Sequence, residues 1–158
     1  MNQVFNANEV FEMAEEIERN GAAFYRAHAE AAYDKPVKKL LLDLAAMEDD
    51  HEKIFSEMRK ALSAPDKGFY DMIPESEPAL YLQSLADVRV FFEKNMPATP
   101  SVIDVLKSAI QAEKDSIVFY LGLKDMVPLD LGRDKIEGII KEEMKHIHML
   151  SVALKENR

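Results

Sequence analysis

The sequence predicts an all-α fold, a four-helix bundle built from two repeated helical hairpins that a long crossover joins. Three observations favour it. Apolar residues recur every three or four positions over four long stretches, as in helices that bury one face. Helix breakers are scarce, with 5 Gly and 7 Pro in 158 residues. Glu-x-x-His also occurs twice, because Glu48 and His51 reappear as Glu143 and His146 at a shift of 143 − 48 = 95 residues.

The first two helices are expected to form an antiparallel hairpin. Asn6 or Asn8 can cap the first helix, whose apolar stripe continues to Ala31. Asp34 can cap the second helix, and Pro36 is tolerated in its first turn, where no backbone N–H is needed. The apolar rhythm of the second helix continues to Leu62. A connection of only a few residues makes the two helices neighbours.

The helical pattern breaks between about residues 64 and 98, a region that contains Pro65, Gly68, Pro74, Pro78 and Pro97. Residues 79–92 can hold one or two short helices. We interpret the segment as a crossover along the bundle, because the second hairpin repeats the first in order and would begin near the same end.

The second hairpin starts after Thr99 and Pro100, with Ser101 opening the third helix. Pro128, followed by residues 129–132, ends this helix and turns the chain. The fourth helix carries the second Glu-x-x-His and runs nearly to the C-terminus.

Composition limits the classes of function. We expect residues 1–158 to form a single domain. The formal charge of −9 argues against nucleic acid or an anionic membrane as a partner. There is no cysteine, which excludes disulfides and thiolate-bound metals within this chain. We see no signal peptide and no membrane span, so the cytoplasm is the expected location.

Six polar side chains fall on the core-facing stripes of the predicted helices. They are Glu18, Glu48, His51, Glu113, Glu143 and His146. Residues three apart on a helix can aim at one point, and the two single glutamates are also related by the 95-residue shift. Four buried carboxylates would repel one another unless cations match their charge, and two divalent ions would do so. Carboxylate and imidazole ligands suit iron or manganese, and zinc accepts them too.

This pattern resembles rubrerythrin-type ferritin-like proteins over all four helices. One Glu from each of two helices with Glu-x-x-His from each of the others is the ligand set of ferritin-like di-iron bundles. The resemblance implies a centre of two iron ions held by the six residues, with manganese or zinc as alternatives. Either Glu48 and Glu143 or the other two glutamates would bridge the metals. Tyr25 and Tyr120 would lie beside the ligands as candidate catalytic phenols, with plain packing as the alternative.

Two features differ from the rubrerythrin pattern. Rubrerythrins resemble a fusion of this bundle to a four-cysteine iron domain that supplies electrons, and this chain has no cysteine. A separate donor, such as a rubredoxin or a small molecule, would therefore be required. Rubrerythrins also usually carry an additional Glu one turn after the single Glu of the third helix, and Ser116 occupies that position here.

The expected function is reduction of hydrogen peroxide, or of dioxygen, by a non-haem di-iron oxidoreductase. Two alternatives remain open: a ferroxidase that passes iron into a storage shell, and a non-catalytic metal-binding or interaction module. The resemblance implies a homodimer or a small homo-oligomer, whereas storage needs a large hollow assembly.

The other histidines and acids are interpreted without a role in metal binding. His28 is expected to be a hydrogen-bonded core residue, and His148 to face solvent. Five further acids are expected to lie on solvated helix faces. They are Glu12, Glu15, Glu16, Glu52 and Glu142.

Overall fold

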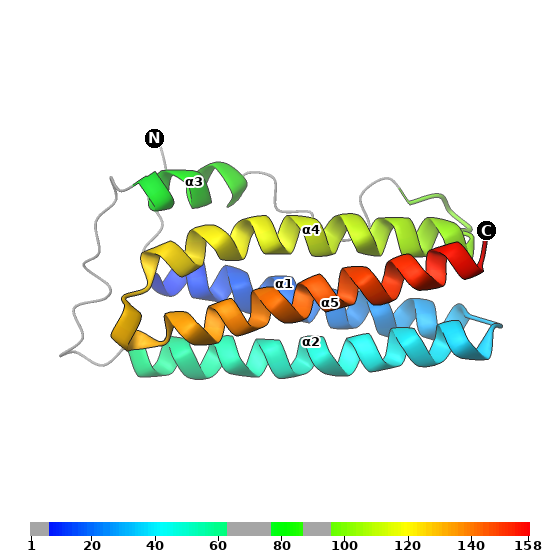
Figure 1. Ribbon diagram of the computed structural model, residues 1–158, viewed down its shortest axis with the longest axis horizontal. Coiled ribbons are helices and arrows are strands. Elements are labelled where there is room, and N and C mark those ends of the chain that lie inside the picture. Colours follow the sequence, from blue (N-terminus) through cyan, green and yellow to red (C-terminus); the bar gives the residue numbers. More distant parts are fainter. Residues whose placement is uncertain (1–6, 63–76, 87–95) are drawn as a thin grey trace.

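Four long helices lie side by side in a bundle, as predicted (Figure 1). The computed structural model describes residues 7–62, 77–86 and 96–158, and every regular element in these ranges is helical. The long helices are α1 (Ala7–Ala31), α2 (Lys35–Leu62), α4 (Val102–Met126) and α5 (Arg133–Glu156). A short helix, α3 (Glu77–Ala86), lies alongside α4 (Figure 1).

The two hairpins run in opposite directions along the bundle. Val10 at the start of α1 and Leu62 at the end of α2 share an apolar cluster with Met126 at the end of α4 and Ile136 near the start of α5. Helices α1 and α5 therefore run one way, and α2 and α4 run the other way (Figure 1). Our expectation that both hairpins begin near the same end is wrong, because the second begins at the end opposite to the first.

The segment between the hairpins connects opposite ends of the bundle, since α2 ends at one end and α4 begins at the other (Figure 1). Most of the predicted crossover, residues 64–76 and 87–95, lies outside the described residues. Its described part contains α3, which agrees with the expectation of a short helix in residues 79–92.

Side-chain caps fix two of the helix starts. The Asp34 carboxylate accepts a hydrogen bond of 3.3 Å from the backbone N–H of Val37, close to the start of α2. Ser101 and Asp104 form a capping box at the start of α4. Asn8 lies inside α1 rather than before it, and Asn6 lies outside the described residues.

A sharp turn joins α4 to α5. A single 3₁₀ turn, η2 (Leu129–Leu131), follows Pro128 and ends at Gly132. Gly132 has φ 101°, in the left-handed region that glycine adopts without a steric penalty. This residue lets the chain reverse directly into α5.

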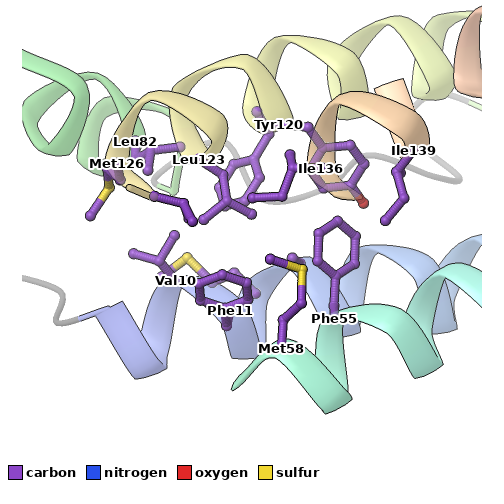
Figure 2. Packing of buried hydrophobic residues seen from close by; sticks show 14 of the residues in the cluster. Val10, Phe11, Phe55, Met58, Leu82, Tyr120, Leu123, Met126, Ile136 and Ile139 are labelled. Carbon is purple, nitrogen blue, oxygen red and sulfur yellow. The ribbon is translucent and has the colours of Figure 1, made fainter. Parts of the chain in front are cut away.

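Two apolar clusters form the core, one towards each end of the bundle. In the first cluster, side chains of all four long helices meet, and Leu82 joins them from α3 (Figure 2). The second cluster contains Tyr25, Leu44, Leu106 and Leu150, among others. On each long helix, the predicted metal-binding residues lie in sequence between members of the two clusters. The predicted metal-binding residues therefore lie at mid-length in the bundle, with an apolar cluster on either side along its axis.

Helix α3 approaches α4 closely at a glycine. A Cβ atom on Gly122 would lie 2.6 Å from a ring carbon of Tyr81 and 3.0 Å from a side-chain carbon of Leu82. The hydroxyl of Tyr81 donates a hydrogen bond of 2.7 Å to the carbonyl oxygen of Val118. The missing side chain at position 122 therefore allows α3 to dock.

Within the described residues, no helix combines the length and the apolar character that crossing a bilayer requires.

Candidate metal centre

The six side chains singled out in the sequence meet in the middle of the bundle. Glu18 comes from α1 and Glu113 from α4, while α2 and α5 each supply one Glu-x-x-His pair. All six are buried, with exposed fractions between 0% for Glu143 and 3% for Glu48. Charged side chains are almost never buried to this degree without a partner.

The donor atoms form two groups that share two glutamates. One group is Glu18, Glu48, His51 and Glu143, and the other is Glu48, Glu113, Glu143 and His146. Within each group the ligand atoms lie within 4.8 Å of one another. Glu48 and Glu143 belong to both groups, so they are the pair positioned between them.

Both histidines direct the same ring nitrogen, Nδ1, towards the carboxylates. Nδ1 of His51 lies 2.8 Å from Oε1 of Glu143 and 3.5 Å from Oε2 of Glu18. Nδ1 of His146 lies 3.0 Å from the other oxygen of Glu143 and 3.1 Å from Oε1 of Glu48. The two imidazole rings are 5.5 Å apart and nearly parallel, with 16° between their planes. The halves of the site therefore have similar geometry.

Many polar atoms of this cluster have no hydrogen-bond partner despite being buried. They are Oε2 of Glu18, Oε1 of Glu48, both carboxylate oxygens of Glu143, Nδ1 of His51, and Nδ1 and Nε2 of His146. Buried polar groups are nearly always hydrogen-bonded, and each unpaired one is costly. Two divalent cations would engage the converging oxygen and Nδ1 atoms and balance four carboxylate charges. The residues present therefore fit a dinuclear metal centre.

The electrostatics of the metal-free cluster agree with this interpretation. Burial, followed by the charges of neighbouring carboxylates, raises the pKa of Glu48 well above its usual value and that of Glu143 to about 8. Burial by itself would lower the histidine pKa values, but the adjacent carboxylates outweigh it. They raise the pKa of His51 to about 11 and that of His146 to about 9. Without cations, the cluster therefore retains protons to reduce its charge.

Two buried tyrosines contact the carboxylates of Glu18 and Glu113, which we call the outer carboxylates, and each tyrosine reaches the glutamate on the other helix. The hydroxyl of Tyr25 on α1 donates a hydrogen bond to Glu113 on α4, and that of Tyr120 on α4 donates to Glu18 on α1. Both rings are fully buried. Burial, followed by the nearby carboxylate charges, raises the pKa of both phenols well above 10. Each phenol therefore contacts one of the two single glutamates of the cluster.

Among the acids predicted to lie on solvated faces, Glu15 is buried, against the prediction, and Glu142 is exposed but contacts a residue of the cluster. Glu15 is only 5% exposed and pairs with Arg59 at 2.6 Å. Glu142 is half-exposed, yet its carboxylate lies 2.6 Å from Nε2 of His51. The spacing contained a signal for Glu15, which precedes the inward-facing Glu18 by three residues, but none for Glu142, since adjacent residues point about 100° apart on a helix.

The two other histidines lie outside the cluster. His148 is exposed, as predicted. His28 is only partly buried, and its ring packs 4.4 Å from that of Phe24.

Comparison with protein families agrees with the site. The family model described as Rubrerythrin matches residues 9–89, slightly more than half of the 158 residues. The chain belongs to the rubrerythrin family. The matched span includes Glu18, Glu48 and His51, whereas the other three residues of the cluster lie beyond it.

Comparison with solved structures confirms the ferritin-like fold. A crystal structure from Thermotoga maritima, described as that of a ferritin-like diiron-carboxylate protein, superposes with a TM-score of 0.75 at 23% identity. The superposition covers 100% of each chain. No curated protein matches the sequence.

Proposed function

We propose that the protein is a cytoplasmic non-haem di-iron oxidoreductase that reduces hydrogen peroxide, or dioxygen, with electrons from a separate donor. The observation that carries the proposal is the pair of buried donor groups that share Glu48 and Glu143. Membership in the rubrerythrin family and the ferritin-like fold support a di-iron protein.

The six residues have distinct roles in this proposal. Glu18 and His51 would hold one metal, at what we call the His51 position, and Glu113 and His146 would hold the other, at the His146 position. Glu48 and Glu143, which belong to both donor groups, would serve both positions. We favour iron because of the family, although the same oxygen and nitrogen ligands accept manganese or zinc.

The chemistry requires two electrons and two protons to convert one molecule of hydrogen peroxide into two of water. Two adjacent iron ions can supply one electron each. The apolar clusters lie on either side of the site along the bundle, and the six side chains are at most 3% exposed. The buried phenols of Tyr25 and Tyr120 keep their protons at neutral pH, because their pKa values are well above 10. Because they are protonated and contact Glu113 and Glu18, they are the proposed proton donors.

The same phenols orient the outer carboxylates. Tyr120 donates to Oε1 of Glu18, which leaves Oε2 of that residue directed towards His51 at 3.5 Å. One oxygen is thus held in place while the other stays available to the metal. Tyr25 donates to Oε1 of Glu113, which is also the oxygen that lies 3.5 Å from Nδ1 of His146, so on this side the phenol and the histidine face the same carboxylate oxygen.

The electrons must come from outside the chain. It has no cysteine and therefore no thiolate-bound iron of its own to act as a donor. A rubredoxin-like protein is the proposed donor, and a homodimer or small homo-oligomer is the proposed assembly.

The test is anaerobic reconstitution with ferrous iron, followed by mixing with hydrogen peroxide and optical detection of iron oxidation. The proposal predicts two irons per chain and oxidation much faster than in a variant carrying Glu48→Ala and Glu143→Ala. A matched control is His148→Ala, because this exposed histidine lies outside the cluster. Equal oxidation rates in the wild-type protein and the double variant would refute the proposal.

Two further measurements separate the alternatives. Iron storage predicts a large hollow assembly in light scattering and loading far beyond two irons per chain. A non-catalytic module predicts stoichiometric metal without consumption of peroxide or dioxygen under several reductants.

A further inference from the structure

The two histidines of the cluster differ on the side that faces away from the metal positions. Nε2 of His51 lies 2.6 Å from the Glu142 carboxylate. Nε2 of His146 is buried and has no hydrogen-bond partner. The residue related to Glu142 by the internal repeat is Met47, since 142 − 95 = 47. A thioether cannot replace the carboxylate as a strong acceptor.

The surroundings of His146 also differ in packing. Its ring lines a cavity of about 340 Å³ between α2 and α5, and Met47 is among the lining residues. Asp50 lines the same cavity, but Nε2 of His146 makes no hydrogen bond with it. His146 therefore lacks the support that Glu142 gives to His51.

This difference has consequences for metal binding. When Nδ1 of a neutral imidazole binds a metal, Nε2 carries the hydrogen and donates it. A carboxylate that accepts this hydrogen bond fixes the ring orientation and makes the ligand more basic. Loss of such a partner usually weakens metal binding by about 10–100-fold.

We propose that Glu142 is a positioning residue that makes the two metal positions unequal, so that the His51 position binds metal more tightly than the His146 position. This inference rests on the dinuclear centre proposed above. It predicts that the His51 position fills first and that a chelator empties the His146 position first.

The test is an anaerobic titration of the metal-free protein with Co²⁺, followed by visible absorption and calorimetry. The wild-type protein should bind two ions in two steps that differ about 10–100-fold in affinity. Glu142→Ala should weaken the first step by a similar factor and leave the other position unchanged. Glu142→Gln should lose less, because its amide oxygen still accepts the hydrogen bond. Met47→Glu, which offers His146 a carboxylate, should strengthen the second step.

A matched control is Glu137→Ala, which removes one exposed carboxylate from the same helix and should change neither step. Two equal steps in the wild-type protein would overturn the inference, as would an equal effect of Glu142→Ala on both positions or none on either. If Glu142→Ala does not fold, the response of the second step to Met47→Glu decides. Failure of the wild-type protein to bind two ions would instead overturn the proposed centre itself.

Discussion

Glutamine in place of Glu143 is expected to stabilise the metal-free protein and to remove its stabilisation by metal. The side chain is 0% exposed, and neither of its carboxylate oxygens has a hydrogen-bond partner. It also belongs to both donor groups. One substitution of nearly equal shape therefore acts with opposite signs on the two forms of the protein.

Proton linkage gives the size of the effect. Burial, followed by the charges of Glu113 and Glu18, raises the pKa of Glu143 from 4.5 to about 8 in the folded metal-free protein. Between these values the folded state keeps a proton that the unfolded chain releases, so stability falls as pH rises. Glutamine does not titrate and removes this loss. Each pH unit is worth at most about 1.4 kcal/mol, so we expect a gain on the order of 1–3 kcal/mol at pH 7.

The assay is thermal unfolding at pH 5 and pH 7, with a chelator and with ferrous iron under anaerobic conditions. For a chain of this length, the expected gain raises the Tm of the metal-free variant by about 2–12 °C at pH 7 and by less at pH 5. Ferrous iron should stabilise only the wild-type protein. Glu137→Gln is the control, because it removes the same single negative charge from an exposed side chain on the same helix. A lower Tm of metal-free Glu143→Gln at pH 7, or an undiminished response to iron, would refute this reasoning.

The remaining predictions concern protons, phenols and the docking of α3. Metal affinity should rise with pH, because both site histidines have raised pKa values and must lose a proton when metal binds. The rise should be at most about tenfold per pH unit for each proton displaced. Calorimetry in buffers of different ionisation enthalpy measures how many protons are released. Tyr25→Phe and Tyr120→Phe should keep two metals but slow oxidation by peroxide about tenfold or more in stopped-flow experiments. Gly122→Ala should weaken α3 docking by about 1–3 kcal/mol through contact with Tyr81, which hydrogen exchange of residues 77–86 measures.

Each of these expectations has a contradicting result. Metal binding without proton release would mean that the metal-free cluster is not protonated as described. Unchanged oxidation rates in both phenylalanine variants would restrict the phenols to packing. Unchanged exchange in Gly122→Ala would show that α3 does not depend on the close approach at this glycine.

The positions of the six cluster residues could be predicted from the sequence because their placement is a local property. Helical periodicity places Glu48 and His51 on one face, and the 95-residue shift places Glu143 and His146 on the corresponding face of another helix. The apolar residues on the same stripes identify that face as buried. The family match reaches only to residue 89, so the repeat was the main sequence signal for the second half of the cluster.

Other features could not be predicted because they depend on how helices face one another. The direction of the second hairpin follows from tertiary packing rather than from the order of helices in the chain. The contact between Glu142 and His51 joins α5 to α2, and the periodicity of a single helix does not reveal it. The docking of α3 depends on a close approach at Gly122, which the sequence shows only as an isolated glycine.

The measurement that tests the central claim most directly is elemental analysis of the purified protein after reconstitution with ferrous iron and removal of unbound metal. We predict two irons per chain in the wild-type protein and loss of both when Glu48 and Glu143 are replaced by alanine. Fewer than two metal ions in the wild-type protein under metal-replete conditions, or the same content in the variant, would contradict the assignment of the buried cluster as a dinuclear centre.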